Sequence, residues 1–449
     1  MNSKRSTASS IRALRAFLNR RRRHPSASAP TAVSLFSGAG LSDMGYCLAG
    51  FRLAVHVELK TDRAEIGQAN FPESTWIRGD LRVCHERVAE AYRARTDTRL
   101  ALLAATPPCQ GMSSSNPSRG KRSTPEARRH AARNALILEV VPVAKALAPR
   151  VIVSENVRQI LTLDTEIDGE KLRTLDLLAR MLPEYRFFET VIDVADYGVP
   201  QRRYRAIVVG VHQDEPWLAE MVEQGRRPWP RPTHSMTGAP RRSRWVTVRQ
   251  WLEGMAYPPL SSQTLEAARD GHPLHFVPHY DRDRFLLVSS IPPHTGKSAY
   301  ANDTCPTCGA QPVPEGRAVC HVCQEPMRNR PIVVERGEAR LIKGFRSSYR
   351  RMPSDQPAST VTTNSSHIGS DNKIHPWEHR VLSILETADL QTVPKFYDWS
   401  PALSKGKSYL VRNVVGEAFP TYFAFLHGQV LRGLLLGANR AFSHLARSE

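Results

Sequence analysis

A single cysteine lies in a loop whose composition could present a reactive thiol. Residues 106–111 read TPPCQG and follow a short apolar run, so Cys109 comes directly after two prolines. Proline restricts the backbone and lacks an amide donor, which would hold the cysteine in a defined place. An isolated cysteine is more often an inert core residue, but one in a polar, proline-braced loop is a candidate nucleophile.

A carboxylate and a row of arginines occur in similar positions. Residues 155–157, ENV, follow another apolar run, and Glu155 could act as an acid or as a hydrogen-bond acceptor if its surroundings raise its pKa. Residues 201–205, QRRYR, begin a predicted strand, so Gln201, Arg203 and Arg205 should alternate onto one face. That face would hold a phosphate or an anionic intermediate, unless it is only a salt-bridged strand end.

A glycine-rich turn and a distant acid have the spacing of a nucleotide-like binding site. Residues 36–40, FSGAG, follow the first apolar run, and Glu58 lies 18 residues beyond Gly40. In α/β folds such a turn brings the backbone close to a ligand, and the acid binds ribose hydroxyls. Asp43 replaces the third glycine of the dinucleotide fingerprint, so a cofactor without a pyrophosphate, such as S-adenosylmethionine, fits better than NAD. A glycine turn without any ligand is the alternative.

Four of the seven cysteines form two CxxC pairs. They are Cys305, Cys308, Cys320 and Cys323, with 11 residues between the pairs. Two such knuckles supply four thiolates in a tetrahedron, so we predict a structural zinc of the ribbon type at about residues 303–325. Four protein ligands leave no open position for catalysis. The alternatives are four reduced cysteines without a metal and, less in keeping with paired knuckles, a redox dithiol.

These candidate residues need a scaffold that brings their loops together. Apolar runs that indicate strands occur at residues 32–36, 53–57, 100–104, 151–153, 187–194 and 205–211, and helical patterns occur at 41–49, 135–147, 172–182 and after 421. Strands that alternate with helices predict an α/β fold with a doubly wound, mostly parallel sheet. Ligands bind such sheets at the carboxyl ends of the strands, which is where the candidate residues lie.

In order along the chain, these segments resemble the motifs of the DNA cytosine-5 methyltransferase family. FSGAG, PPCQG, ENV and QRRYR are similar to its cofactor, nucleophile, catalytic glutamate and QxRxR motifs, and residues 79–81, GDL, are similar to its adenine-side motif. Residues 357–362, 390–394 and 416–420 resemble the motifs that follow its recognition region. Glu417 and Phe419 stand where the family more often has Asn and Val, a departure that leaves the catalytic groups in place.

The resemblance implies a role for each matching residue. Catalysis would depend on Cys109 as nucleophile, Glu155 beside N3 and the amino group of cytosine, and Arg203 and Arg205 as anchors for the base and a neighbouring phosphate. S-adenosylmethionine would be bound by Phe36, Ser37, Gly38, Ala39, Gly40, Leu41, Glu58, Asp80, Pro108, Glu417 and Ala418. The implied fold is the Rossmann-like fold of S-adenosylmethionine-dependent methyltransferases, with a smaller target recognition domain inserted.

The resemblance also divides the chain. We expect a basic arm at residues 1–30, the first part of the catalytic domain at 31–215, a target recognition domain with the zinc ribbon at 216–345, and the closing part of the catalytic domain at 346–449. The family motifs stop within 216–345, so the sequence does not predict the target bases. The ribbon could scaffold that domain, contact DNA or bind a protein, and we favour the scaffold.

The implied reaction is methyl transfer to carbon 5 of a flipped-out cytosine in a specific sequence of double-stranded DNA, in prokaryotic restriction-modification or phage defence. Partners would be the DNA and a cognate restriction endonuclease or defence-system protein. We expect a monomer in the cytoplasm, associated with the nucleoid. Two alternatives remain. Methylation of tRNA is disfavoured by the long recognition segment, and a catalytically silent DNA-binding scaffold is disfavoured by the complete set of catalytic residues.

The charge of the chain agrees with a polyanionic partner. The 449 residues include 62 Lys and Arg against 43 Asp and Glu, a formal net charge of +19, which favours binding to nucleic acid or to an anionic membrane surface. No run approaches the 18 apolar residues of a membrane span. Residues 1–30 hold eight basic residues and no acid. We expect a mobile arm that lies along phosphates or is merely solvated, although organelle transit peptides share this composition.

Overall fold

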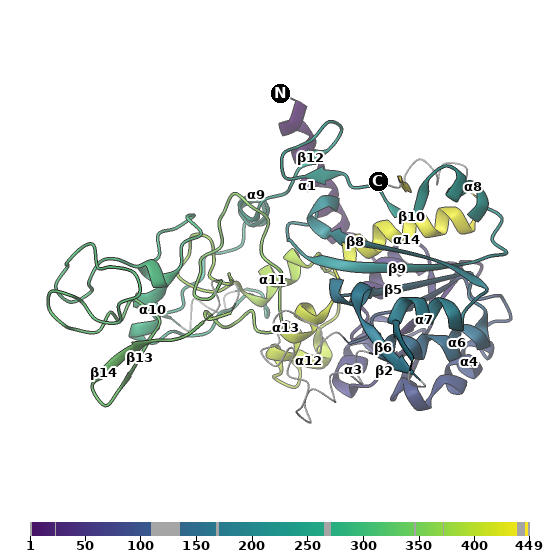
Figure 1. The fold of residues 1–449 in the computed structure, drawn as a ribbon, viewed down its shortest axis with the longest axis horizontal. Coiled ribbons are helices and arrows are strands. Elements are labelled where there is room, and N and C mark those ends of the chain that lie inside the picture. Colours follow the sequence, from purple (N-terminus) through teal and green to yellow (C-terminus); the bar gives the residue numbers. More distant parts are fainter. Residues whose placement is uncertain are drawn as a thin grey trace.

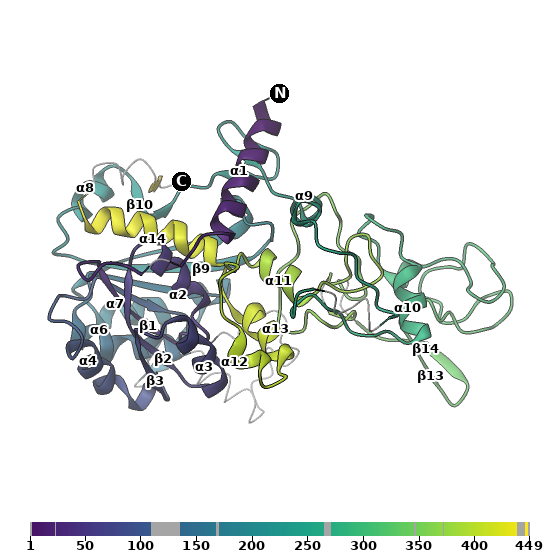
Figure 2. The ribbon, with the colours of Figure 1, turned by 180° about the vertical axis from the view of Figure 1, so that it is seen from behind.

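The computed structural model describes residues 2–22, 24–108, 135–167, 170–264, 271–344, 347–370, 372–437 and 445–447. The chain forms a larger lobe around a β-sheet and a smaller, extended lobe beside it (Figure 1). A view from behind shows the first helix standing at the junction of the two lobes (Figure 2). No helix in these described ranges is long and apolar enough to cross a membrane.

The larger lobe is built on a seven-stranded sheet with the order β3-β2-β1-β4-β5-β9-β8. Its strands are β1 (Thr31–Leu35), β2 (Arg52–Glu58), β3 (Thr75–Arg78), β4 (Leu102–Ala105), β5 (Val151–Asn156), β8 (Tyr185–Asp193) and β9 (Tyr204–His212). The first five pair in parallel, and β9 runs antiparallel to both β5 and β8. The predicted doubly wound, mostly parallel sheet is confirmed.

Helices cover both faces of the sheet, because side chains alternate along each strand. Ala32 of β1 belongs to one apolar core, whereas Val33 and Leu35 belong to another. The sheet is therefore buried on both faces, as parallel sheets require. The first core contains α2 (Leu41–Leu48), α3 (Thr61–Asn70) and α14 (Thr421–Leu435), and the second contains α4 (His85–Arg93), α6 (Val140–Leu147) and α7 (Thr174–Met181).

Shorter elements lie in the connections of the larger lobe. Segment 216–230, which we assigned to target recognition, packs here, because Trp217, Met221 and Trp229 belong to the larger core. It contains α8 (Leu218–Glu223) and β10 (Arg226–Pro230), and β10 pairs with β15 (Leu445–Arg447). The other short elements are the hairpin of β6 (Asp164–Ile167) and β7 (Glu170–Arg173) and 3₁₀ turns at Leu81–Val83, Ala135–Glu139, Arg158–Thr162 and Val194–Tyr197.

The last helices return to the start of the sheet. These helices are α11 (Ile384–Leu390), α12 (Ser400–Leu403) and α13 (Ser408–Glu417), and they are followed by α14. α14 packs against α2 so closely that a Cβ added at Gly45 would lie 2.5 Å from the carbonyl oxygen of Thr421. The two ends of the chain therefore form one folded unit around the sheet.

The N-terminal segment is a helix and not the mobile arm that we expected. In α1 (Asn2–Leu18), Phe17 and Leu18 are only 1% and 0% exposed. The Phe17 ring lies 5.0 Å from Tyr422 and 5.1 Å from Phe425 of α14. The expectation was wrong because burial of apolar residues at helical spacing stabilises the helix. This favourable free energy exceeds the cost of holding the charges of the exposed face in place.

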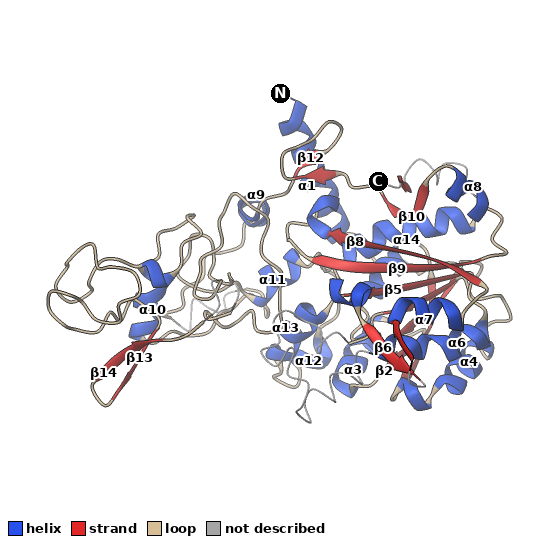
Figure 3. Ribbon diagram, viewed as in Figure 1, coloured by secondary structure: helices blue, strands red, loops and turns tan. Residues whose placement is uncertain are grey.

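The smaller lobe has little regular structure (Figure 3). One small apolar core surrounds Val288 and Ile374, and another surrounds Cys305 and Cys320. The chain reaches this lobe through a short parallel pair beside α1. That pair is β11 (His234–Ser235) and β12 (Ser243–Arg244). It is followed by α9 (Val248–Leu252), whose Val248, Trp251 and Leu252 belong to the larger core, and by a 3₁₀ turn at Glu253–Met255. The elements of the smaller lobe itself are α10 (Arg282–Ser289), a 3₁₀ turn at Ala299–Ala301 and the antiparallel hairpin of β13 (Ile332–Glu335) and β14 (Glu338–Leu341).

Buried arginines hold this lobe together where apolar packing is thin. Arg351 is 0% exposed, and Arg330 is 1% exposed. The Arg351 guanidinium donates at 2.6–3.2 Å to the carbonyl oxygens of Val288, Ile291, His375 and Glu378. The Arg330 guanidinium donates at 2.7–2.8 Å to those of Asn302, Val313, Pro314 and Arg317. Each guanidinium cross-links several loops, so these positive charges serve the fold.

Candidate active site

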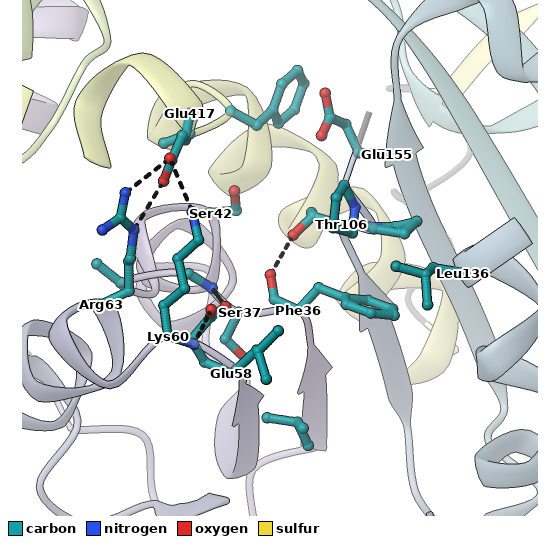
Figure 4. A pocket seen from close by; sticks show the side chains of 18 of the residues that line it. Phe36, Ser37, Ser42, Glu58, Lys60, Arg63, Thr106, Leu136, Glu155 and Glu417 are labelled. Carbon is teal, nitrogen blue, oxygen red and sulfur yellow. Dashed lines mark hydrogen bonds and ion pairs between the residues drawn. The ribbon is translucent and has the colours of Figure 1, made fainter. Parts of the chain in front are cut away.

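A cavity of about 520 Å³ opens at the carboxyl ends of β1, β2, β4 and β5. Figure 4 shows side chains from these strands and from the end of α13 around it. Its volume suits a ligand of nucleoside size. Gly40 and Arg203 are not among its lining residues, but most residues that we expected at a site are: Phe36, Ser37, Gly38, Ala39, Leu41, Glu58, Asp80, Pro108, Glu155, Arg205, Glu417 and Ala418.

The glycine-rich turn after β1 is held by the acid at the end of β2. One carboxylate oxygen of Glu58 accepts from the amide of Gly38 and the other from the amide of Lys60, both at 2.8 Å. Burial raises the pKa of Glu58, and the two amides and the Lys60 ammonium oppose that rise. At Gly40 the backbone has a φ of +80°, and an added Cβ would lie 2.7 Å from the Phe71 ring. The turn therefore requires glycine there and places Glu58 against its backbone.

The residue that replaces the third glycine has a structural role. Asp43 is 3% exposed and accepts hydrogen bonds from Ser34 Oγ at 2.9 Å and from His56 Nδ1 at 3.1 Å. The His56 ring stacks on Trp76 with centroids 4.3 Å apart. This buried network joins β1, α2 and β2 behind the turn. The sequence showed the missing glycine but not the network, because its members come from separate elements.

A carboxylate and a guanidinium face the cavity from adjacent strands. Glu155 in β5 and Arg205 in β9 lie 2.8 Å apart, and each side chain is 14% exposed. The antiparallel pairing of β5 with β9 brings them together. Burial raises the pKa of Glu155, and Arg205 and Arg203 oppose that rise. Glu155 therefore keeps its proton to a higher pH than an ordinary glutamate, which is what a hydrogen-bond donor to a ring nitrogen needs.

The other two residues of the QxRxR segment brace the chain behind the cavity. Arg203 is 2% exposed and donates to the carbonyl oxygens of Val361 at 2.8 Å and Gly416 at 3.2 Å. Gln201 accepts from the amide of Val361 at 2.8 Å and donates to Gln391 Oε1 at 2.7 Å. Arg203 therefore braces these segments and does not line the cavity, and its predicted role as an anchor for the base and a neighbouring phosphate stays a prediction.

Two basic residues that the sequence analysis missed stand at the rim of the cavity. Arg63 Nη2 lies 3.0 Å and Lys60 Nζ 3.6 Å from Glu417 Oε1. The ion pairs join α3 to the end of α13 across the rim (Figure 4). They explain why a carboxylate is stable at the position where the chain departs from the family pattern. A signal was present, because both cations follow Glu58 within five residues.

Asp80 follows β3 at the same edge of the sheet. Its carboxylate accepts from the amide and from the Nε of Arg82, both at 3.0 Å. These hydrogen bonds from Arg82 lower the pKa of Asp80. Asp80 is thus an ionised acceptor at neutral pH, and it lines the cavity.

Two hydrogen bonds anchor the segment that leads to Cys109. Thr106 Oγ1 donates to the carbonyl oxygen of Phe36 at 2.9 Å, and Asn156 Nδ2 donates to that of Pro107 at 3.1 Å. The start of the loop is therefore tied to the glycine turn and to the strand that carries Glu155. Cys109 itself lies outside the described residues, so its role as nucleophile stays a prediction.

A sequence profile of the family C-5 cytosine-specific DNA methylase matches residues 31–428. The chain belongs to this family. The type II methyltransferase M1.HgaI of Avibacterium volantium is 27% identical over 402 residues, which cover 86% of this chain and 94% of the relative. M.Eco47II of Escherichia coli is 25% identical over 414 residues, which cover 91% and 80%. The solved structure of the Entamoeba histolytica methyltransferase EhMeth shares the fold, with a TM-score of 0.52 at 11% identity over 91% of this chain and 99% of that one.

The smaller lobe of this DNA methylase brings the four paired cysteines together. Their Sγ atoms all lie within 4.8 Å of one another. The distance is 3.7 Å from Cys305 to Cys323 and 3.8 Å from Cys308 to Cys320. Thiolates bound at about 2.3 Å in a tetrahedron are about 3.8 Å apart, whereas disulfide sulfurs lie at about 2.0 Å. The cluster therefore fits four ligands of one metal ion and not two disulfides.

Backbone contacts shape each knuckle around the cluster. The amide of Cys305 donates to the carbonyl oxygen of Ala310 at 2.9 Å, and Gly309 between them has a φ of +75°. The amide of Val322 donates to Cys320 Sγ at 3.3 Å. Amide donors stabilise negative charge on sulfur, as a thiolate ligand requires. The Arg330 guanidinium ties down the segment between the two pairs.

Proposed function

We propose that this DNA methylase transfers a methyl group from S-adenosylmethionine to carbon 5 of a cytosine flipped out of a specific double-stranded DNA sequence. The observation that carries the proposal is the single cavity that joins the Glu58 turn to the Glu155–Arg205 pair. If the Glu58 turn binds the nucleoside part of the methyl donor and Glu155 binds the acceptor base, one cavity brings donor and base into contact. A base inside a stacked duplex cannot enter such a cavity, so the cytosine must be flipped.

The lining residues suit the donors and acceptors of S-adenosylmethionine, which supplies an electrophilic methyl group. Glu58 would accept from the ribose hydroxyls, because each of its oxygens has one further acceptor position besides the amide that it binds. Asp80 would accept from the adenine amino group. The turn from Phe36 to Leu41, with Pro108 and Ala418, would form the walls around the rest of the molecule.

The protein side chains would carry the chemistry on the base. The Cys109 thiolate adds to carbon 6 of cytosine, and the electron density moves to carbon 5. Glu155 donates its proton to N3 and accepts from the amino group, which offsets the charge that builds on the ring. Carbon 5 would take the methyl group, with S-adenosylhomocysteine as the leaving group. A base would then remove the carbon-5 proton, the restored double bond would expel the Cys109 thiolate, and N3 would return its proton to Glu155. Arg205 would hold the Glu155 carboxyl against the ring.

Bisulfite or nanopore sequencing of DNA from cells that express the protein tests the reaction and reports the target sequence together. We expect methylated cytosines in one short sequence context in cells with the wild-type protein. Cells with the Cys109→Ser variant should show none, because a serine hydroxyl is not ionised at neutral pH, while binding to DNA should survive. Normal methylation by that variant would rule out the assigned nucleophile.

The two relatives that match over most of their length support a role in restriction-modification. Both M1.HgaI and M.Eco47II are named as type II methyltransferases. We infer that this chain modifies DNA in the cytoplasm of a prokaryote, with a cognate restriction endonuclease or defence-system protein as a partner. Plasmid DNA from expressing cells should resist an endonuclease that cuts the mapped sequence. Full cleavage of a fully methylated plasmid would contradict this role.

We also infer that the cysteine cluster holds one structural zinc ion. The Sγ spacing and the four-thiolate donor set suit zinc, and no ligand position remains open for catalysis. Elemental analysis of the purified protein should find about one zinc per chain. A metal-free protein with four titratable thiols in this segment would refute the inference.

A further inference from the structure

Two arginine-rich segments that lie far apart in the sequence meet on one surface. α1 packs beside β12, and both stand at the junction of the two lobes (Figures 1 and 2). Arg12 of α1 is exposed, and so are Arg241, Arg242 and Arg244 around β12. We call these four residues the junction patch. They lie outside the cavity, since none of them lines it.

The guanidinium groups of the junction patch form no ion pair within the described part of the chain. No carboxylate there pairs with any of the four guanidinium groups, and no hydrogen bond occupies them. Glu253 lies 3.9 Å from Arg249, and Asp196 accepts from Trp245 Nε1 at 2.8 Å. Burial raises the pKa of Asp196, and the charge of Arg242 opposes that rise without an ion pair. Four unpaired positive charges on one surface create a field that attracts a polyanion.

The helix that carries Arg12 is anchored, which distinguishes this part of the patch from a solvated basic tail. Phe17 and Leu18 anchor α1 in the larger core, and Arg12 lies on the exposed side of the helix. α1 holds no acidic residue along its length. The amide of Lys395 also donates to the carbonyl oxygen of Leu18 at 2.9 Å. The Arg12 charge therefore keeps a fixed position relative to β12, and fixed charges bind phosphates at a lower entropic cost than a mobile arm.

We propose that the junction patch is a second DNA-binding surface, which contacts the phosphate backbone beyond the recognised sequence. Guanidinium groups donate paired hydrogen bonds to phosphate oxygens, which suits an all-arginine patch. The proposal rests on the proposed function, because that function makes a long DNA duplex the polyanion that the enzyme meets. Contacts of this kind raise affinity and fix orientation, but they do not read bases.

A charge-removal experiment with a matched control tests this surface. The patch variant is R12Q/R241Q/R242Q/R244Q. The control variant, R87Q/R93Q/R180Q/R186Q, removes equal charge from exposed positions on α4, α7 and β8. Each phosphate contact contributes about 0.9 to the slope of log K against log salt concentration. For a duplex of about 40 base pairs without the target, we expect the slope to become shallower by about 2 to 4 in the patch variant and by less than about 1 in the control.

Duplex length separates the patch from the recognition site. Wild-type protein should bind a target duplex of about 40 base pairs more tightly than one of about 14, and the patch variant should lose this preference. Its methylation of the shorter duplex should stay within about twofold of wild type. Equal salt slopes in the two variants would overturn the proposal. This is also the result expected if the patch binds an acidic protein and not DNA.

Two further comparisons keep the outcome interpretable. If the fourfold variant does not fold, the pairs R12Q/R242Q and R241Q/R244Q should each show about half of the slope change, and no change in either pair would refute the proposal. If wild-type protein methylates no DNA, the proposed function fails. The binding slopes still test the patch in that case, because they require no methyl transfer.

Discussion

At the residue scale, Glu155 shows how burial prepares a carboxyl group for catalysis. Its side chain is 14% exposed, and burial raises its pKa against the opposing charges of Arg205 and Arg203. A glutamate in water would have lost its proton well below neutral pH. Burial therefore raises the proton occupancy of the group, while the strand pairing that places Arg205 beside Glu155 sets its orientation.

Replacing Glu155 by Gln should lower the rate of methyl transfer by about 10²- to 10⁴-fold, the usual contribution of a positioned acid. Binding of S-adenosylhomocysteine should change by less than about twofold, because the assigned cofactor contacts remain. Transfer of tritiated methyl groups and calorimetry measure the two quantities. The exposed Glu189→Gln serves as control. A near-normal rate in Glu155→Gln would exclude the assigned role.

The same substitution should change stability in a pH-dependent way. The folded-state pKa of Glu155 is raised above its ordinary value of 4.5, so the folded protein binds this proton more tightly than the unfolded chain. Its contribution to stability is present below pH 4.5 and is lost as pH rises through the folded pKa. The stability of Glu155→Gln relative to wild type, measured by urea unfolding, should therefore increase between pH 4 and 7. A constant difference would contradict the raised pKa.

Arg203→Lys should weaken the fold around the cavity. A lysine cannot reach both the Val361 and the Gly416 carbonyl oxygens, so at least one buried acceptor loses its partner. We expect a loss of about 1 to 3 kcal/mol in the free energy of unfolding and a higher KM for S-adenosylmethionine, because Gly416 precedes the rim residue Glu417. Arg186→Lys on the exposed surface is the control. Unchanged stability would show that Arg203 does not brace these segments.

At the scale of elements, α1 shows how an apolar stripe outweighs a basic composition. Phe17 packs on Tyr422 and Phe425, so α1 covers the start of the helix that completes the larger core. Arg22 also pairs with Glu73 at 3.0 Å after the helix ends. The helix is therefore part of the larger lobe, and its exposed face carries Arg12 of the junction patch.

Phe17→Ala should reduce the free energy of unfolding by about 3 to 5 kcal/mol, as expected for a buried aromatic side chain that leaves a cavity. Ala16→Ser on the exposed face of the same helix should have little effect. Denaturant unfolding measures both. If the two variants were equally stable, α1 would not be packed as described, and residues 1–30 would be the mobile arm that their charge suggested.

At the scale of the whole molecule, the basic residues behind the net charge of +19 have different roles in different places. Arg330 and Arg351 are buried and bind carbonyl oxygens, so they hold the smaller lobe together. Arg203 is buried in the larger lobe, and Arg205 faces the cavity. The junction patch remains outside. Net charge alone therefore overstates the number of residues that can contact DNA.

Removal of the metal should weaken DNA binding but leave cofactor binding intact. The core around the cysteine cluster is small, so chelation should unfold the ribbon and weaken specific DNA binding by at least about tenfold. Binding of S-adenosylhomocysteine should persist, because the cavity lies in the larger lobe. Cys305→Ser should reproduce this result, and Cys84→Ala in the second core of the larger lobe is the control. Loss of cofactor binding on chelation would show that the lobes fold as one unit.

The sequence by itself determined the fold class and most of the residues around the cavity. Periodic apolar runs identify most strands and helices, and the carboxyl ends of parallel strands must meet at one edge, so Glu58 and Glu155 converge without further information. Asp80 follows β3, which the apolar runs did not predict, and only the family resemblance pointed to it. The cysteine pairs likewise carry their ligand spacing in the sequence. Local patterns suffice for such features because backbone geometry connects them directly.

Only the tertiary structure decided which charges are buried and which partners they take. Arg203 and Arg205 look alike in the sequence, yet one binds backbone carbonyl oxygens and the other faces Glu155. Lys60 and Arg63 meet Glu417 across more than 350 residues, and α1 meets β12 across more than 200. The physical reason is that pairing energies depend on burial and distance, which are set when the whole chain packs and which no local pattern contains.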